Sequence, residues 1–312
     1  MKESEIDQLV DWVNCDLCGG KNYRIIYPGA FTRADFVKDP SSSFRYASSE
    51  HARGNIVECA DCHLVYMNPR DRDIPTIYEN VGEDEYYLSA QEDRIATFER
   101  DYQKLESVIG SAKGRKMIDV GCSYGLFLGV CQRHGWEVYG CEPSKVQWAK
   151  AREYYAHVYN KELRNCGFSD NLFDLVTMHE VIEHPSSPKA LIRDARAVIK
   201  PGGYLVLCTP DRSSWQAKIF GKRWIAYARM HLYYFTPHTL RRMLEEEGFR
   251  VVKIEKHKRI IRFGVAIEWM RKNPFLYRVF LAIFGNFLTR NIKITSAMSG
   301  NMMVYAQKID QV

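Results

Sequence analysis

Short apolar runs alternate with amphipathic stretches from about residue 113 onward. The runs are rich in Val, Ile, Leu, Met and Cys, whereas apolar residues in the intervening stretches recur every three or four positions. Runs of the first kind are typical of buried strands, and stretches of the second kind are typical of helices. The alternation therefore predicts a doubly wound, mostly parallel sheet, which binds ligands at the carboxyl ends of its strands. We expect strands at 116–120, 137–141, 173–178, 204–208 and 250–256, and helices at 126–134, 145–155, 188–199 and 237–247.

Two further stretches extend this pattern. Residues 74–112 are polar with apolar residues at helical spacing, so we expect an amphipathic connector there. Between Phe275 and Leu288 one wide apolar stripe flanked by basic residues predicts a helix, and residues 299–308 are expected to form a last, antiparallel strand. The helix is interpreted as a lid over a cleft, as a dimer face, or as an interfacial helix. In the last case residues 271–293 make a peripheral contact with anionic lipid.

The composition is that of a globular chain. Of the 312 residues, 46% are hydrophobic and 26% are charged, which argues against disordered and fibrous classes. The longest apolar stretch, residues 279–288, is far too short to cross a bilayer. The net charge is +6, but residues 253–312 contain 11 Lys and Arg against 3 Asp and Glu, a charge of +8 that leaves −2 for the rest. This basic end favours an anionic partner such as phosphate, nucleic acid or lipid headgroups, and a solvated surface is the equal alternative.

Cysteines supply the first candidate chemistry. The nine cysteines are an odd number, the chain opens without a signal peptide, and several cysteines fall in apolar runs, so we expect a cytoplasmic protein, with a membrane-peripheral position as a variant. Two C-x₂-C pairs, Cys15 with Cys18 and Cys59 with Cys62, have the spacing with which each pair binds one face of a tetrahedral zinc ion. Four protein ligands leave no position for a substrate, so this zinc would be structural. The alternative is four unrelated buried cysteines.

A glycine-containing loop follows the first strand of the predicted sheet. The strand carries Asp119 near its end and runs into residues 121–125, with the sequence Gly-Cys-Ser-Tyr-Gly. A dinucleotide site would have G-x-G-x-x-G and a pyrophosphate at the helix N-terminus, whereas the carboxylate of Asp119 disfavours a pyrophosphate and suits a cationic ligand. The second strand leads into Glu142, whose carboxylate is placed to accept hydrogen bonds from both ribose hydroxyls of an adenosine.

These residues resemble the class I S-adenosylmethionine-dependent methyltransferases, whose glycine loop reads Asp-x-Gly-x-Gly-x-Gly. This chain keeps Asp119, Gly121 and Gly125 and has Ser123 at the middle glycine. The N-terminal Cys₄ module is similar to that of a subgroup associated with sugars, surface polysaccharides and secondary metabolites. Further segments resemble the family's fourth-strand motif, its turn into the fifth strand and a later small-molecule methyltransferase segment: 173–184, 200–205 and 231–249.

The resemblance implies a Rossmann-like α/β fold with a doubly wound, seven-stranded, mostly parallel sheet, an antiparallel last strand and a small N-terminal zinc-binding module. It divides the chain into that module at 1–73, a helical connector at 74–112, and a methyltransferase domain at 113–312 with cap insertions near 212–235 and 261–293. It implies S-adenosylmethionine as the cofactor, bound by Asp119, Gly121, Cys122, Ser123, Tyr124, Gly125, Glu142, Pro143, Met178, His179 and Glu180.

Methyl transfer from a sulfonium is an in-line displacement, so holding the acceptor and the methyl group in line supplies much of the catalysis. A base is needed only where the acceptor must lose a proton early. We expect that base at the end of the fourth strand, with His184 ranked first and His179 second. Glu183 is a base or orients a histidine, and His231 is a further candidate. The alternative is that these side chains only position the loop or bind cofactor edges.

The pattern Glu180-x-x-Glu183-His184 also permits a divalent-ion site, because two carboxylates and an imidazole one helical turn apart can hold Mg²⁺. A similar pattern occurs in quinone-biosynthesis O-methyltransferases, and an ion there would acidify a phenol or catechol hydroxyl. The insertion near 212–235 contains three aromatic residues that form either an acceptor pocket or an ordinary cap core: Phe220, Trp224 and Tyr227.

The leading interpretation is an enzyme that methylates a small-molecule acceptor, such as a nucleotide-linked or lipid-linked sugar or a secondary metabolite. An RNA methyltransferase is the rival, since a zinc module and a basic segment can bind a phosphate backbone. We do not expect nucleic acid as the partner, because residues 1–72 are not strongly basic and no Asn-Pro-Pro-Tyr-like motif follows the fourth strand. A non-catalytic scaffold protein would be expected to have a glycine loop that no longer fits the cofactor. Ser123 is the only position at which this loop departs from the family pattern. The acceptor, the methylated element and the oligomeric state stay open.

Overall fold

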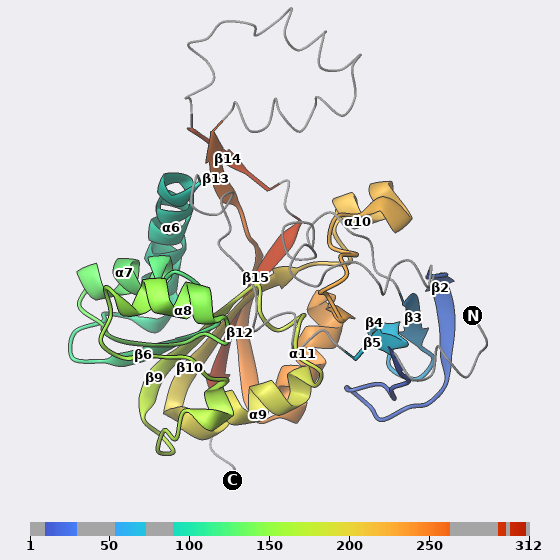
Figure 1. Ribbon diagram of the computed structural model, residues 1–312, viewed down its shortest axis with the longest axis horizontal. Coiled ribbons are helices and arrows are strands. Elements are labelled where there is room, and N and C mark those ends of the chain that lie inside the picture. Colours follow the sequence, from blue (N-terminus) through green and yellow to red (C-terminus); the bar gives the residue numbers. More distant parts are fainter. Residues whose placement is uncertain (1–9, 30–53, 73–89, 263–292, 298–299, 310–312) are drawn as a thin grey trace, which may run out of the picture.

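The computed structural model describes residues 10–29, 54–72, 90–262, 293–297 and 300–309. The basic apolar helix expected within 271–293, and nearly all of the insertion expected near 261–293, lie outside these residues. Within them the chain forms a large central sheet covered by helices and, beside it, a smaller sheet that carries the Cys₄ cluster (Figure 1).

The central sheet has seven strands in the order β12-β15-β10-β9-β6-β7-β8. Neighbours from β10 through β8 pair in parallel, whereas β15 is antiparallel to both β10 and β12. This topology confirms the predicted doubly wound sheet with an antiparallel last strand. The strands are β6 (Lys116–Val120), β7 (Glu137–Cys141), β8 (Val158–Tyr159), β9 (Phe173–His179), β10 (Ile199–Pro210), β12 (Phe249–Lys256) and β15 (Asn301–Lys308).

Helices cover both faces of this sheet. Tyr102 and Leu105 of one helix and Phe127 of the next belong to a core on one face, and Ile192 and Leu244 belong to a core on the other. Local capping fixes the start of some of these helices; for example, Ser187 caps α9 and a proline follows directly. The helices are α6 (Gln91–Ile109), α7 (Leu126–Arg133), α8 (Lys145–Arg152), α9 (Pro188–Val198) and α11 (Pro237–Glu246), with a short 3₁₀ turn η1 (Leu163–Asn165).

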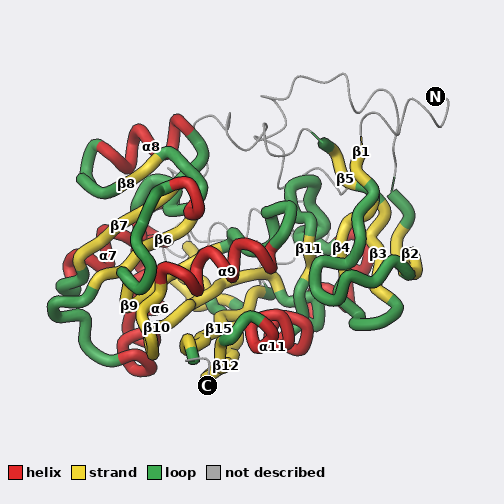
Figure 2. The backbone as a smooth tube through the Cα atoms, turned by 90° about the horizontal axis from the view of Figure 1, so that it is seen from below, coloured by secondary structure: helices red, strands yellow, loops and turns green. Residues whose placement is uncertain are grey.

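The smaller, antiparallel sheet has the order β11-β4-β3-β2 and lies beside the central sheet (Figure 2). Its edge strand β11 comes from the insertion near 212–235, more than 160 residues beyond β4. Cys15, Leu64 and Tyr66 of this sheet share one hydrophobic core with the α9 and α11 face of the central sheet. The strands are β2 (Tyr23–Tyr27), β3 (Asn55–Cys59), β4 (Val65–Asn68) and β11 (Tyr233–Tyr234), with a separate pair β1 (Val10–Asp11) and β5 (Arg70–Asp71).

The insertion after β10 forms α10 (Trp215–Phe220) and the 3₁₀ turn η2 (Gly221–Arg223). Trp224 and Tyr227 are buried against Ile56 and Val65 of the smaller sheet, whereas Phe220 is exposed. Trp224 and Tyr227 therefore form a cap core, the second of the two interpretations from the sequence, and Phe220 lies outside it. A pair of strands that the sequence pattern did not predict, β13 (Arg259–Arg262) and β14 (Lys293–Ser296), packs near α6. None of the helices in the described part of the chain combines the length and apolar character that a membrane span requires.

Candidate functional site

The loops after β6 and β9 meet at the carboxyl edge of the central sheet. From β6 the chain moves to β7 and β8 on one side, and it returns to β9 on the other side of β6. A reversal of this kind is the topological switch point at which doubly wound sheets bind ligands. Val120 at the end of β6 pairs with Met178 of β9, so the glycine loop and the segment from His179 to His184 start side by side.

The glycine loop needs residues without a side chain at two positions. Gly121 and Gly125 adopt φ angles of +68° and +76°. A Cβ atom at position 121 would lie 2.6 Å from Cγ2 of Val181, and one at position 125 would lie 2.6 Å from the ring of Tyr155. Ser123 also has a positive φ, +50°, although it is not glycine. Its backbone N–H donates to Oε2 of Glu142 at 2.9 Å, a charge-assisted contact that offsets part of this strain.

Glu142 lies buried beneath this loop. Its second carboxylate oxygen, Oε1, accepts a hydrogen bond from the backbone N–H of Ser144 at 2.8 Å. Burial raises its pKa to about 7, against the opposing effect of the two N–H groups. The side chain of Asn160 donates to the backbone carbonyls of both Glu142 and Pro143, each at 2.8 Å, and so holds the turn in place. Since each carboxylate oxygen has two lone pairs, Glu142 retains the capacity to accept from ribose hydroxyls.

Asp119 and His179 lie near the carboxyl ends of the neighbouring strands β6 and β9. Asp119 is buried, its Oδ1 accepts a hydrogen bond from Thr177 at 2.6 Å, and the same oxygen lies 3.6 Å from Nδ1 of His179. Burial acts to lower the pKa of His179, but Asp119 outweighs it and the pKa is raised. The imidazole packs against the rings of Phe98 and Phe127. Three other residues proposed to contact the cofactor are buried, two in the glycine loop and one in β9: Cys122, Tyr124 and Met178.

Glu180 is held by residues from the C-terminal part of the chain. It has a φ of +57°, and its Oε1 accepts hydrogen bonds from Arg259 and, at 2.7 Å, from Asn301. Burial opposes ionisation of Glu180, but the charges of Arg259 and Arg94 prevail and lower its pKa to about 2. The carboxylate is therefore already neutralised by cationic and amide donors, and it is absent from the group of side chains that could hold a metal beside Glu183.

Glu183, His184 and His231 come together instead. One carboxylate oxygen of Glu183 and one ring nitrogen from each histidine all lie within 4.8 Å of one another. Oε2 of Glu183 accepts from Thr209 at 2.9 Å, while its buried Oε1 has no hydrogen-bond partner within the described residues. Nδ1 of His184 contacts the carbonyl of Met230 and Nδ1 of His231 contacts that of Ala226, each at 2.9 Å. A carbonyl can only accept, so both Nδ1 atoms donate.

Glu183 is buried and both histidines are half-buried, and this burial sets the protonation of the cluster. Burial, helped by the charge of Glu180, raises the pKa of Glu183 to about 8. Burial lowers the pKa of His184, and burial together with His184 lowers that of His231 to about 3. Both imidazoles are therefore neutral near pH 7, the state in which an imidazole nitrogen accepts a proton or binds a cation. His179 lies apart from this cluster, on the side of Asp119.

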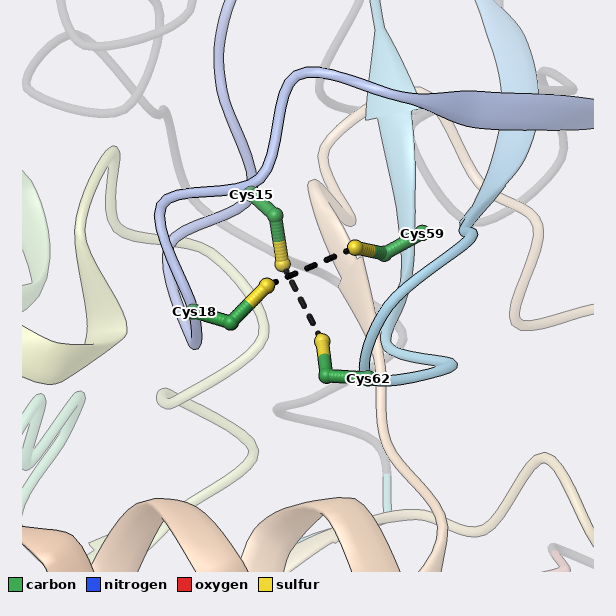
Figure 3. Close-up of side chains that lie close together, drawn as sticks. All are labelled: Cys15, Cys18, Cys59 and Cys62. Atoms are coloured by element: carbon green, nitrogen blue, oxygen red, sulfur yellow. Dashed lines mark hydrogen bonds between the residues drawn. The ribbon is translucent and has the colours of Figure 1, made fainter.

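The four N-terminal cysteines converge in the smaller sheet (Figure 3). Sγ of Cys15 lies 3.4 Å from Sγ of Cys62, and Sγ of Cys18 lies 3.5 Å from Sγ of Cys59. Tetrahedral zinc with Zn–S bonds of about 2.3 Å requires sulfur separations of about 3.8 Å, so the donor set fits this ion. Burial raises the pKa of Cys62 to about 12 and that of Cys15 still further, so both thiols would need a cation to ionise near neutral pH.

Several residues that shape the site were not predicted from the sequence. Thr177 and Thr209 are polar residues within buried strands that lead to the carboxyl edge, a pattern that would have marked them as partners for Asp119 and Glu183. Arg259 and Asn301, which hold Glu180, lie 79 and 121 residues away from it along the chain. No local pattern connects positions at such separations.

Comparisons with known proteins bear on this site. Residues 90–254, just over half of the chain, match the family model described as a methyltransferase domain. The ubiquinone biosynthesis O-methyltransferase of Erwinia tasmaniensis is 25% identical over 206 residues, which cover 62% of this chain and 75% of that protein. Its counterpart from Cronobacter sakazakii is 23% identical over 209 residues, covering 64% and 76%. A solved SAM-dependent methyltransferase from Archaeoglobus fulgidus is 22% identical with a TM-score of 0.49, covering 72% of this chain and all of that one.

The matched residues contain α6, the glycine loop, Glu142 and the Glu183-His184 segment, whereas Arg259 and Asn301, which hold Glu180, lie beyond the match. The sheet order and the antiparallel β15 agree with the fold that the resemblance implied. The chain belongs to the methyltransferase-domain family and is a class I S-adenosylmethionine-dependent methyltransferase.

Proposed function

We propose that this enzyme transfers a methyl group to a hydroxyl oxygen of a small-molecule acceptor. The observation that carries the proposal is the cluster of Glu183, His184 and His231, in which both imidazoles are neutral near pH 7 and able to accept a proton. An alcohol or phenol must lose its proton when its oxygen is methylated, so such a cluster suits O-methylation. The relatives named above as O-methyltransferases support the same reaction class.

The glycine loop and Glu142 are the groups proposed to hold the cofactor. Gly121 and Gly125 leave room for a close approach of the ligand, Glu142 accepts from the ribose hydroxyls, and the carboxylate of Asp119 favours a cationic ligand. When bound, S-adenosylmethionine supplies an activated methyl group on a sulfonium. The residues of the chain then have to align the acceptor and take up its proton.

His184 is the proposed base. Its Nδ1–H donates to the carbonyl of Met230, and this contact orients the ring and favours the tautomer with the lone pair on Nε2. Burial keeps the pKa of His184 below its ordinary value, so the imidazole enters the reaction unprotonated. Glu183, which accepts from Thr209 through Oε2, lies beside both histidines. Because its pKa is raised to about 8, it is mainly protonated near pH 7 and would help to orient the imidazoles.

A second candidate is O-methylation of a phenol or quinol with the help of a divalent ion. It is favoured by the buried Oε1 of Glu183, which has no hydrogen-bond partner in the described part of the chain and lies near two histidine nitrogens. This ligand set differs from the Glu-x-x-Glu-His pattern because His231 joins it and Glu180 is held by Arg259 and Asn301. A bound ion would lower the pKa of the acceptor hydroxyl.

The acceptor class is tested by measuring release of S-adenosylhomocysteine from purified enzyme with nucleotide sugars, lipid-linked sugars, phenols and quinols, and structured RNA. Each reaction is run with a chelator and then with added Mg²⁺ or Mn²⁺. Methylation of a hydroxylated small molecule supports the proposal, and loss with chelator that is restored by metal selects the second candidate. Turnover with RNA alone, or methylation at nitrogen or carbon, would refute the proposal.

A further inference from the structure

The segment from Trp215 to Ile225 exposes an unusual amount of apolar surface. Of the nine large hydrophobic residues that are exposed in the described part of the chain, four lie within these eleven residues. They are Trp215 (50% exposed), Ile219 (70%), Phe220 (53%) and Ile225 (63%). Isolated exposed hydrophobic residues are common, but a group of this kind, with three members on α10 and one just after η2, marks an interaction site.

Cations are interspersed with these apolar side chains. Lys218, Lys222 and Arg223 are exposed in the same segment, and it contains no acidic residue. We name the outward side chains of this segment the α10 surface: Trp215, Lys218, Ile219, Phe220, Lys222, Arg223 and Ile225. Large apolar groups combined with basic residues are the composition of segments that lie in a membrane interface.

The α10 surface rests on a firm support. Ala217 and Trp224 of the same segment are buried in the core shared with the smaller sheet, and Nε2 of Gln216 donates to the carbonyl of Ala297 at 2.7 Å. In Figure 1, α10 lies at the edge of the molecule, between the central sheet and β2. The apolar side chains are therefore held outward by the fold, so their exposure does not arise from a loose loop.

We propose that the α10 surface docks onto an anionic lipid bilayer. The apolar side chains would enter the boundary between headgroups and acyl chains, and the three cations would meet phosphate groups of the lipid. A contact between two copies of this chain fits less well. In a two-fold contact the surface would meet itself, so Lys218, Lys222 and Arg223 would face the same cations with no acid within the segment to balance them. The proposal uses none of the residues within 271–292, and it does not depend on which acceptor the enzyme methylates.

The test is co-sedimentation of the full-length protein with vesicles of phosphatidylcholine, with and without phosphatidylglycerol. We expect binding that is markedly tighter to the anionic vesicles and that weakens with salt. The double variant Ile219→Ser with Phe220→Ser should weaken binding at least about tenfold, because both substitutions remove apolar area from the membrane interface. Removing one cation should weaken binding to anionic vesicles about fivefold. The double variant Lys218→Glu with Lys222→Glu should therefore weaken this binding more than either single substitution does.

Matched controls are Tyr154→Ser, an aromatic residue that is 75% exposed on another part of the molecule, and Lys113→Glu, an exposed lysine in the loop before β6. Both controls should bind vesicles as the wild type does. Calorimetric affinity for S-adenosylmethionine should be unchanged in every variant, which shows that each one is folded. The proposal is overturned if the wild type shows no preference for anionic vesicles, or if the α10 variants bind as tightly as the controls. It is also overturned if light scattering shows a dimer that Ile219→Ser with Phe220→Ser converts to a monomer while vesicle binding stays absent.

Discussion

At the carboxyl edge of the central sheet, a single side chain can make several structural contacts. Glu142 accepts from the backbone N–H groups of Ser123 and Ser144, and so links the glycine loop to the turn after β7. Ser123 has a positive φ although it is not glycine, and the contact of its backbone N–H with Glu142 offsets part of that strain. A change at Glu142 should therefore affect both ligand affinity and the shape of the loop.

Glu142→Ala should lower the affinity for S-adenosylmethionine by at least about tenfold. The change removes the proposed ribose acceptor and leaves two backbone N–H groups without a partner, each at a cost of about 1–3 kcal/mol where they stay buried. Isothermal titration calorimetry measures the effect. Glu137→Ala is the matched control, since Glu137 begins β7, the strand that leads to Glu142, and is exposed and paired with Lys116. Equal affinity in Glu142→Ala and the control would remove Glu142 from the cofactor site.

The raised pKa of Glu142 predicts a pH dependence of stability. Its folded-state pKa of about 7 exceeds the ordinary value of 4.5, so the folded protein binds this proton more tightly than the unfolded chain does. The stabilisation is complete below about pH 4.5 and is lost as pH rises through about pH 7. Urea unfolding of the cofactor-free protein should show a free energy of unfolding that falls across this window, with a smaller slope in Glu142→Gln. Parallel profiles for the two proteins would contradict the assignment.

At the scale of elements, the Cys₄ sheet and the active-site segment are joined by hydrogen bonds. Asp16, which lies between Cys15 and Cys18, accepts from the hydroxyl of Ser187 at 2.8 Å and from the backbone N–H of Lys189 at 2.9 Å. These groups begin α9, directly after the segment that carries Glu183 and His184. The smaller sheet therefore contacts the segment that follows the proposed base.

Zinc should be found in the purified protein at about one ion per chain, bound by the four thiolates. Cys59→Ser should lose this ion and should melt the smaller sheet at a lower temperature than the central sheet, because the metal joins the two C-x₂-C turns of the smaller sheet. Elemental analysis and thermal unfolding with two probes measure the two effects. Cys166→Ser, a cysteine outside the cluster, is the control and should keep its zinc. A zinc-free wild type, purified without chelator, would disprove this assignment.

Asp16→Ala should lower kcat by about fivefold to tenfold and leave zinc content and affinity for S-adenosylmethionine unchanged. The substitution removes a cap worth about 1 kcal/mol from the start of α9, and so loosens the segment that carries His184. Asp61→Ala is the matched control, because Asp61 occupies the other C-x₂-C turn. Steady-state kinetics are measured for both variants. A fall in kcat for Asp61→Ala as well, or a change only in the KM for the cofactor in Asp16→Ala, would argue against a positioning role of Asp16.

At the scale of the whole molecule, the sequence predicted the central sheet well because its signals are local. The strands at 116–120 and 137–141 have the predicted bounds, since each is a short run that ends at a glycine or at a Glu-Pro pair. Pairings between distant segments could not be predicted. Strand β11 joins β4, and Arg259 reaches Glu180, across separations at which no periodicity connects the residues.

In the candidate site, too, features with a local sequence signal could be predicted, and contacts between distant segments could not. The order of Asp119, the glycine loop and Glu142 along the chain was sufficient to predict a cofactor site at one sheet edge. The grouping of His184 with His231, and the separation of both from His179, depends on where the segment after β10 folds back. The sequence ranking of His184 above the other histidines remains a prediction to be tested by kinetics.

The central claim is that His184 takes the proton of the acceptor, and the rate of a single turnover measures this step most directly. With the acceptor identified by the substrate panel, and with enzyme in excess and saturated with S-adenosylmethionine, His184→Ala should slow methyl transfer by about 10²- to 10⁴-fold. Cofactor affinity should stay nearly unchanged, and His238→Ala, at an exposed histidine on α11, should react at the wild-type rate. A wild-type single-turnover rate in His184→Ala, with or without added divalent metal, would contradict the account.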